Sequence, residues 1–80
     1  MNNNQLLRTI VRNQYMVSTV RLRYNVGWDL RHEYETMVFK YDAEADKVSD
    51  WLELDCLRSP TEAEALISHS DMIFKWSAPE

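Results

Sequence analysis

The amino-acid sequence predicts an α+β fold in which a three-stranded antiparallel sheet packs on one C-terminal helix. Three segments alternate polar and apolar side chains with the period of a β-strand. The C-terminal part of the chain carries a helix start signal followed by helical periodicity. The chain has 80 residues, and most domains hold roughly 50–200 residues. We therefore expect residues 1–80 to form a single small α+β domain.

The N-terminal segment, residues 1–14, fits two different elements. Residues 1–5 are almost entirely polar and are expected to be disordered. Four apolar side chains that follow have the spacing of a short helix: Leu6, Leu7, Ile10 and Val11. Residues 9–11 fit a strand as well. The sequence thus leaves both a short helix and an extra strand open for this segment.

The three strand candidates are residues 15–26, 34–41 and 51–57. One alternating set of side chains is expected to face the helix, and it includes Met16, Val20, Leu22, Met37, Phe39, Leu52, Leu54 and Cys56. The opposite face would carry Tyr15, Val17, Thr19, Thr36, Val38 and Trp51. On that face, basic side chains of the first two strands would lie opposite acidic ones of the third. Residues 25–33 are interpreted as a longer loop, and residues 42–47 as an acidic hairpin loop.

A helix is predicted over residues 60–76. Ser59 is a favourable N-cap, Pro60 suits the first helical position, and Glu62 completes a capping box three residues after the cap. One polar strip runs along the helix: Glu64, Ser68, Asp71 and Lys75. The opposite arc is apolar and is expected to lie on the sheet: Ala63, Leu66, Ile67, Ile73 and Phe74.

The formal net charge of −4 is unevenly distributed along the chain. Residues 1–31 hold five arginines and one aspartate, whereas residues 32–80 hold four basic and twelve acidic residues. Such asymmetry arises in three ways. The two halves neutralise each other within the fold, chains associate head to tail, or one face binds a charged partner.

The sequence argues against catalysis, metal binding and cofactors. A single glycine in the chain leaves no glycine-rich phosphate loop and no nucleophile elbow. The acidic residues from Asp42 to Glu53 have the spacing of an EF-hand calcium loop, but Lys47 occupies the position that requires glycine. His69 is expected roughly 14 Å along its helix and Cys56 roughly 5 Å into its strand, too far apart for a nucleophile and its base. We therefore predict that the protein is not an enzyme.

The side chains available for interaction favour a non-catalytic protein-binding module. Aromatic and arginine side chains anchor many protein interfaces, and the candidates are Trp28, Arg31, Tyr34 and Trp51. An acidic set is expected to engage a basic partner surface: Asp42, Glu44, Asp46, Asp50, Glu62 and Glu64. A core this small is marginal alone, so a homodimer is a further expectation. Because no apolar run is long enough to span a membrane and no targeting segment is visible, we expect a cytoplasmic protein without membrane contact.

Nucleic-acid binding is the alternative function. With a short N-terminal helix, the element order would match a double-stranded-RNA-binding domain, but Glu62 and Glu64 lie where such domains carry basic residues. The sheet face away from the helix would then offer a platform for bases, formed by Tyr15, Arg21, Arg23 and Lys40. A pI near 5.1 argues against this alternative.

Several segments carry a family resemblance when they are taken together. They are Glu35-Thr36-Met37-Val38-Phe39, Glu53-Leu54-Asp55-Cys56, Thr61-Glu62-Ala63-Glu64-Ala65, His69, Met72 and Lys75-Trp76. In this combination the chain resembles a family of small proteins from bacteriophages and prophages that has no established activity. The resemblance covers residues 33–76 and implies phage origin and an accessory role in the host cytoplasm. Together with the acidic surface, it leads to the hypothesis of a module that docks on and inhibits a host defence or nucleic-acid-handling complex.

Overall fold

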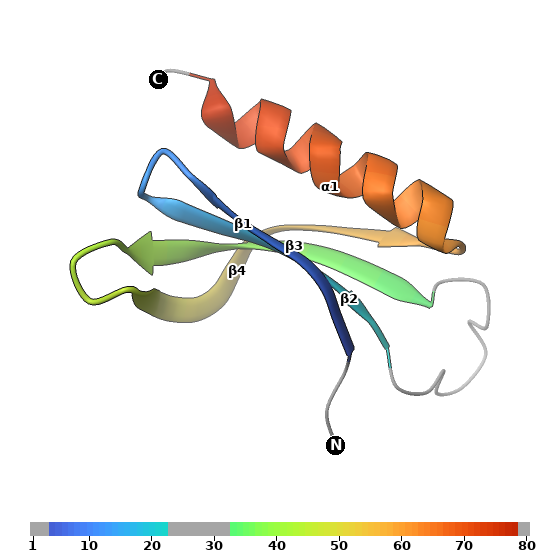
Figure 1. The fold of residues 1–80 in the computed structure, drawn as a ribbon, viewed down its shortest axis with the longest axis horizontal. Helices are drawn as coiled ribbons and strands as arrows, with labels where there is room; N and C mark the ends of the chain where they lie inside the picture. Colours follow the sequence, from blue (N-terminus) through green and yellow to red (C-terminus); the bar gives the residue numbers. More distant parts are fainter. Residues whose placement is uncertain (1–3, 23–32, 79–80) are drawn as a thin grey trace.

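The computed structural model describes residues 4–22 and 33–78. Within these ranges the chain forms β1 (Asn4–Val11), β2 (Tyr15–Arg21), β3 (Tyr34–Asp42), β4 (Lys47–Ser59) and α1 (Glu62–Ser77). Each strand pairs antiparallel with the next one along the chain, and α1 crosses one face of the sheet (Figure 1). The α+β class, with an antiparallel sheet packed on a C-terminal helix, is therefore confirmed.

The N-terminal segment is a strand, so the sheet formed by residues 4–22 and 33–78 has four strands where three were predicted. β1 begins at Asn4, and residues 4 and 5, expected in a disordered start, belong to the sheet. Residues 1–3 lie outside the described residues. β1 and β2 are joined by a tight turn in which Arg12 and Asn13 have left-handed φ angles of 54° and 55°. Such turns match the twist of the paired strands, and this pairing decides between the two options that local spacing left open.

The predicted acidic hairpin loop joins β3 to β4, and its geometry depends on two of its aspartates. Asp42 Oδ1 accepts the backbone N–H of Glu44 at 3.0 Å and that of Ala45 at 3.2 Å. Asp46 has a left-handed φ of 54°, a conformation that aspartate tolerates better than most residues. The side chains of this loop therefore have a local structural role.

β4 is longer than predicted and strongly bent (Figure 1). It begins at Lys47 rather than Trp51. The pairing with β3 jumps from Val38↔Asp55 to Lys40↔Asp50, so β4 has extra residues between two successive pairs. Extra residues of this kind form a bulge, which bends a strand and increases its twist. The bent half of β4 curves toward the face of the sheet that α1 does not cover.

The helix lies on the sheet face opposite to the one predicted. Val17 and Val38 are completely buried and pack against Met72 of α1, whereas Leu52 and Leu54, which were predicted to face the helix, are exposed. The period-two alternation was useful for grouping residues by face, but alternation alone does not show which group is covered. Residues of the predicted first strand beyond Leu22 lie outside the described residues.

Helix α1 begins two residues later than predicted and ends at Ser77. The N-cap is Thr61 rather than Ser59, and its Oγ1 accepts the backbone N–H of Glu64 at 3.2 Å. Thr61 and Glu64 have the same spacing as Ser59 and Glu62, so the sequence contained two overlapping capping boxes. Ser59 instead ends β4 and is buried. Within the two described ranges, no helix is long and apolar enough to cross a membrane.

Candidate functional site

A buried histidine holds the middle of α1 on the sheet. His69 is only 3% exposed, and its two ring nitrogens bond the hydroxyls of Thr9 on β1, at 2.9 Å, and Thr19 on β2, at 2.7 Å. Thr19 in turn bonds Thr36 on β3 at 2.7 Å. Burial lowers the pKa of His69, because the charged form loses solvation. With both ring nitrogens occupied, His69 links the helix directly to β1 and β2, and through Thr19 to β3.

A second set of polar contacts ties α1 to β4. Asp55 Oδ2 accepts hydrogen bonds from Lys75 Nζ at 2.6 Å and from the indole N–H of Trp76 at 3.1 Å. Nearer the helix start, the hydroxyls of Ser59 and Ser68 are 3.0 Å apart. Burial opposes ionisation of Asp55, but the hydrogen bonds to its carboxylate outweigh burial and lower its pKa. These contacts fix the rotation of α1 about its own axis.

The consequence of this rotation is an apolar row on the outside of the helix. Phe74 is 84% exposed and Ile67 is 61% exposed, and Leu66 beside them is also exposed. Leu66, Ile67 and Phe74 are called the outer stripe below. The sequence predicted these three side chains on the sheet, and the structure places them on the solvent side. The residues buried instead are Ala65, His69 and Met72.

The thiol of Cys56 lacks the features of a nucleophile. Partial burial, and then the carboxylate of Glu35 beside it, raise the pKa of the Cys56 thiol. Its Sγ lies 3.9 Å from Glu35 Oε2, and the same carboxylate binds Arg58 at 3.0 Å. No group of three or more histidine, cysteine, aspartate or glutamate side chains suited to a metal ion occurs among the described residues.

The acidic residues predicted to bind a partner do not form one surface. Asp42, Glu44 and Asp46 lie in the β3–β4 hairpin, whereas Glu62 and Glu64 lie at the start of α1, beyond the opposite end of β4 (Figure 1). Several of them also serve local structure. Asp46 accepts a short hydrogen bond from the hydroxyl of Tyr41, and Glu64 is part of the helix cap. Asp50 Oδ1 accepts the N–H of Leu52 at 3.0 Å.

The aromatic candidates that the structure describes, Tyr34 and Trp51, differ in exposure. Trp28, Arg31 and Arg23 lie outside the described residues. Tyr34 is buried, and Trp51 is exposed on the open face, as predicted, with its ring edge-on to that of Phe39 at 5.2 Å.

The proposed base platform of the first two strands is not formed. Tyr15 lies under the helix, with its ring 5.0 Å from that of Trp76. Arg21 is paired with Glu33 at 3.1 Å, and its guanidinium lies 6.0 Å from the ring of Tyr34. Lys40 is exposed and lies opposite Asp50 in the strand pairing. The three members of this set that the structure describes, Tyr15, Arg21 and Lys40, are therefore not available together on an open face.

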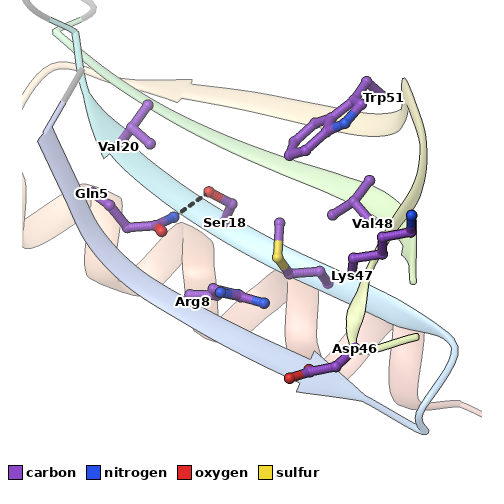
Figure 2. Close-up of a pocket in the computed structure, with 9 residues that line it drawn as sticks. Gln5, Arg8, Ser18, Val20, Asp46, Lys47, Val48 and Trp51 are labelled. Carbon is purple, nitrogen blue, oxygen red and sulfur yellow. Dashed lines mark hydrogen bonds between the residues drawn. The ribbon is translucent and has the colours of Figure 1, made fainter. Parts of the chain in front are cut away.

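The structure also contains a groove that sequence reasoning missed. It has a volume of about 440 Å³ and lies on the sheet face away from α1 (Figure 2). The groove is lined by Gln5 and Arg8 of β1, Met16, Ser18 and Val20 of β2, and Asp46, Lys47, Val48 and Trp51 at the bent start of β4. The sequence leaves both a helix and a strand open for residues 1–14 and predicts the start of the last strand at Trp51, so it does not place β1 and residues 46–48 around one groove.

Comparison with protein-family models, with curated proteins and with solved structures finds no match for this chain. The resemblance to small bacteriophage proteins therefore stays a prediction, and function has to be argued from the surfaces described above.

Proposed function

We propose that this chain is a non-catalytic protein-binding module that presents the outer stripe of α1 to a partner protein. The observation that carries this proposal is the exposure of Phe74 and Ile67 on a helix whose opposite face is already packed. Isolated exposed apolar side chains are common, but large ones that recur on one face of an element are typical of interaction sites. Ile67 and Phe74 are seven residues apart, which is the spacing of anchors in helix-in-groove recognition.

The charges around the outer stripe indicate the chemistry of the partner. Exposed carboxylates flank the stripe on α1: Glu62, Glu64 and Asp71. A complementary surface would have an apolar groove with lysine or arginine side chains on its rim. Proteins that handle nucleic acids carry such basic surfaces. We therefore propose as the partner a basic protein of a host defence or nucleic-acid-handling complex, which a phage accessory protein would block in the host cytoplasm.

The helix is well prepared for such docking. His69 bonds β1 and β2 from the inner side of the helix. Asp55 bonds the end of α1 from the same side. The outer stripe is consequently presented without any rearrangement of the fold. A rigid binding element loses little conformational entropy on association, which favours affinity.

Site-specific photo-crosslinking tests this proposal and identifies the partner. A photoreactive amino acid is placed at Phe74, which is 84% exposed, in one variant and at Leu52 of β4, which is 72% exposed, in the control. The protein captured only from position 74 is then purified and titrated with the native chain. Phe74→Ser should weaken binding by about tenfold or more, because it removes an aromatic anchor that the proposed partner would bury. Leu52→Ser should leave the affinity within about twofold.

Three outcomes would contradict the proposal. The first is an equal loss of affinity in Phe74→Ser and Leu52→Ser, which would indicate non-specific hydrophobic association. The second is a captured partner with an acidic contact surface, or binding that strengthens as salt is added. The third is a homodimer by light scattering that Phe74→Ser converts to monomer, because the outer stripe would then be covered by a second copy.

A further inference from the structure

The groove on the open sheet face lies on the opposite side of the sheet from the outer stripe. We propose that it binds a nucleotide unit, with the base stacked on Trp51 and the phosphate held between Arg8 and Lys47. The three residues come from β1 and from the bent start of β4, and all of them line the same groove (Figure 2). This site is independent of the protein-binding function, because it uses none of the residues of α1.

Among the described residues, the two cations of the groove have no carboxylate partner, and the charge of Arg8 acts on the hydroxyl of Tyr41. Neither Arg8 nor Lys47 makes a hydrogen bond or ion pair through its side chain to any residue in the ranges 4–22 and 33–78. By contrast, three other cations are paired with carboxylates: Arg21, Arg58 and Lys75. Asp46 is the acidic residue in the lining, and its carboxylate already accepts the hydroxyl of Tyr41. The groove therefore has a local excess of positive charge available to an anion.

Trp51 offers a flat surface at the rim of the groove. It is 70% exposed, and its ring is held edge-on against Phe39 at 5.2 Å, so the indole is positioned without being covered. In Figure 2 the indole lies above the groove, on the same side of the sheet as Ser18 and Val48. Bases of any sequence stack on such a ring. An indole combined with nearby cations favours a nucleotide over a simple anion or an aliphatic acid.

The floor of the groove supplies polar groups that can contact a base edge. Gln5 Nε2 donates a hydrogen bond to Ser18 Oγ at 2.6 Å and a longer one to the carbonyl of Leu7 at 3.5 Å. Both N–H groups of the Gln5 amide are thereby used, which leaves its oxygen as an acceptor. Ser18 accepts from Gln5 and keeps its own O–H as a donor. Base edges present donors and acceptors side by side, and these would match the Gln5 acceptor oxygen and the Ser18 donor hydroxyl.

Size and overall charge limit the ligand. A volume of about 440 Å³ falls within the roughly 300–1,000 Å³ of small-molecule sites. The formal net charge of −4 opposes the accumulation of a long polyanion along the protein. The groove therefore suits a free nucleotide or the one or two nucleotides of a single strand that enter it. Both sources share the same chemistry, a base carrying a phosphate.

Amide chemical-shift titration of the full chain tests the proposal. AMP, adenosine, inorganic phosphate and a short single-stranded oligonucleotide are added separately. We expect AMP to shift the amides of β1, β2 and the start of β4, and to bind about tenfold more tightly than adenosine or phosphate alone, because it makes both contacts. An oligonucleotide that binds more tightly than AMP and competes with it would identify a strand as the source. AMP that binds as tightly as the oligonucleotide would identify the free nucleotide.

Matched variants separate this site from general electrostatics. Trp51→Ala should weaken AMP binding by about fivefold or more, and Trp51→Phe should restore part of it, since base stacking on an aromatic ring is retained. Lys47→Gln should weaken binding, whereas Lys40→Gln, which removes an exposed cation outside the groove lining, should not. Equal weakening by the two lysine variants would overturn the proposal. So would the absence of shifts in the groove, or phosphate that binds as tightly as AMP.

Discussion

The inner face of α1 joins apolar packing by Ala65 and Met72 to polar links with the sheet, whereas large apolar side chains are exposed on its outer face. The inner face is attached to the sheet by polar side chains, with His69 bonded to threonines and Asp55 bonded to the end of the helix. The outer face carries Phe74 and Ile67 in solvent. The buried side of this helix thus combines hydrogen-bond partners on the sheet with the core packing of Met72, and the width of the apolar arc did not predict it. The comparison teaches that a helix can leave its more apolar arc exposed when the polar groups on its buried side have hydrogen-bond partners in the sheet.

His69→Ala, on the inner face of α1, should reduce the free energy of unfolding more than any other substitution considered below. His69→Ala leaves a cavity and deprives the hydroxyls of Thr9 and Thr19 of their partner, so we expect a loss of about 3 kcal/mol in the free energy of unfolding. Urea denaturation followed by circular dichroism measures it. Ile67→Ala on the outer face is the control and should change stability by less than about 0.5 kcal/mol. Similar losses for the two variants would contradict the assignment of the faces.

The contact between Asp55 and the end of α1 should have the next largest effect. Asp55→Ala removes the acceptor of the Trp76 indole N–H and of Lys75, and we expect a loss of about 1–2 kcal/mol. Much of the effect should persist in high salt, because the exposed Lys75 contributes little through its charge. Asp71→Ala, an exposed carboxylate elsewhere on α1, is the matched control. A loss that disappears in 1 M salt, as judged by thermal unfolding, would show that the indole bond is unimportant.

The burial of His69 should also make stability depend on pH. Because burial lowers the pKa of His69 below its ordinary value of 6.5, the unfolded chain binds more protons than the folded one as the pH falls. The contribution is complete above pH 6.5 and is lost as the pH decreases through the folded pKa. We therefore expect a decline in stability below pH 6.5 that is reduced in His69→Gln. Parallel pH profiles for the two proteins would contradict this origin.

The smallest stability effect is expected at Phe74, despite its size. Phe74→Ser should change the free energy of unfolding by less than about 0.5 kcal/mol, because the side chain is almost fully in solvent. A core phenylalanine would lose several times more, about 3–5 kcal/mol when truncated. Chemical denaturation of the variant distinguishes the two cases. A large loss would place Phe74 in the core and remove the basis of the protein-binding proposal.

The sequence predicted the fold class and the approximate strands and helix, because these depend on local periodicity and capping. Alternation located β2, β3 and most of β4, and a Ser/Thr-x-x-Glu pattern located the start of α1 to within two residues. The N-terminal strand could not be settled in the same way, because β1 is defined by its pairing with β2. Local spacing carries no information about such a partner.

The orientation of the helix and the site were not predictable from local patterns. The wide arc containing Leu66, Ile67 and Phe74 is the more apolar one, so amphipathicity alone pointed it at the sheet. Only the positions of Thr9 and Thr19, on two different strands, show why His69 turns inward instead. The groove was missed for a related reason, since one of its walls is β1 and the other is formed by the bend in β4.

The most direct measurement is the pattern of nuclear Overhauser contacts between α1 and the sheet. The ring protons of His69 should contact the methyl groups of Thr9 and Thr19, and the ring protons of Phe74 should show no contact with Val17 or Val38. Contacts from Phe74 to those valines, with His69 free of the threonines, would show that the helix is rotated the other way and that its apolar arc is buried.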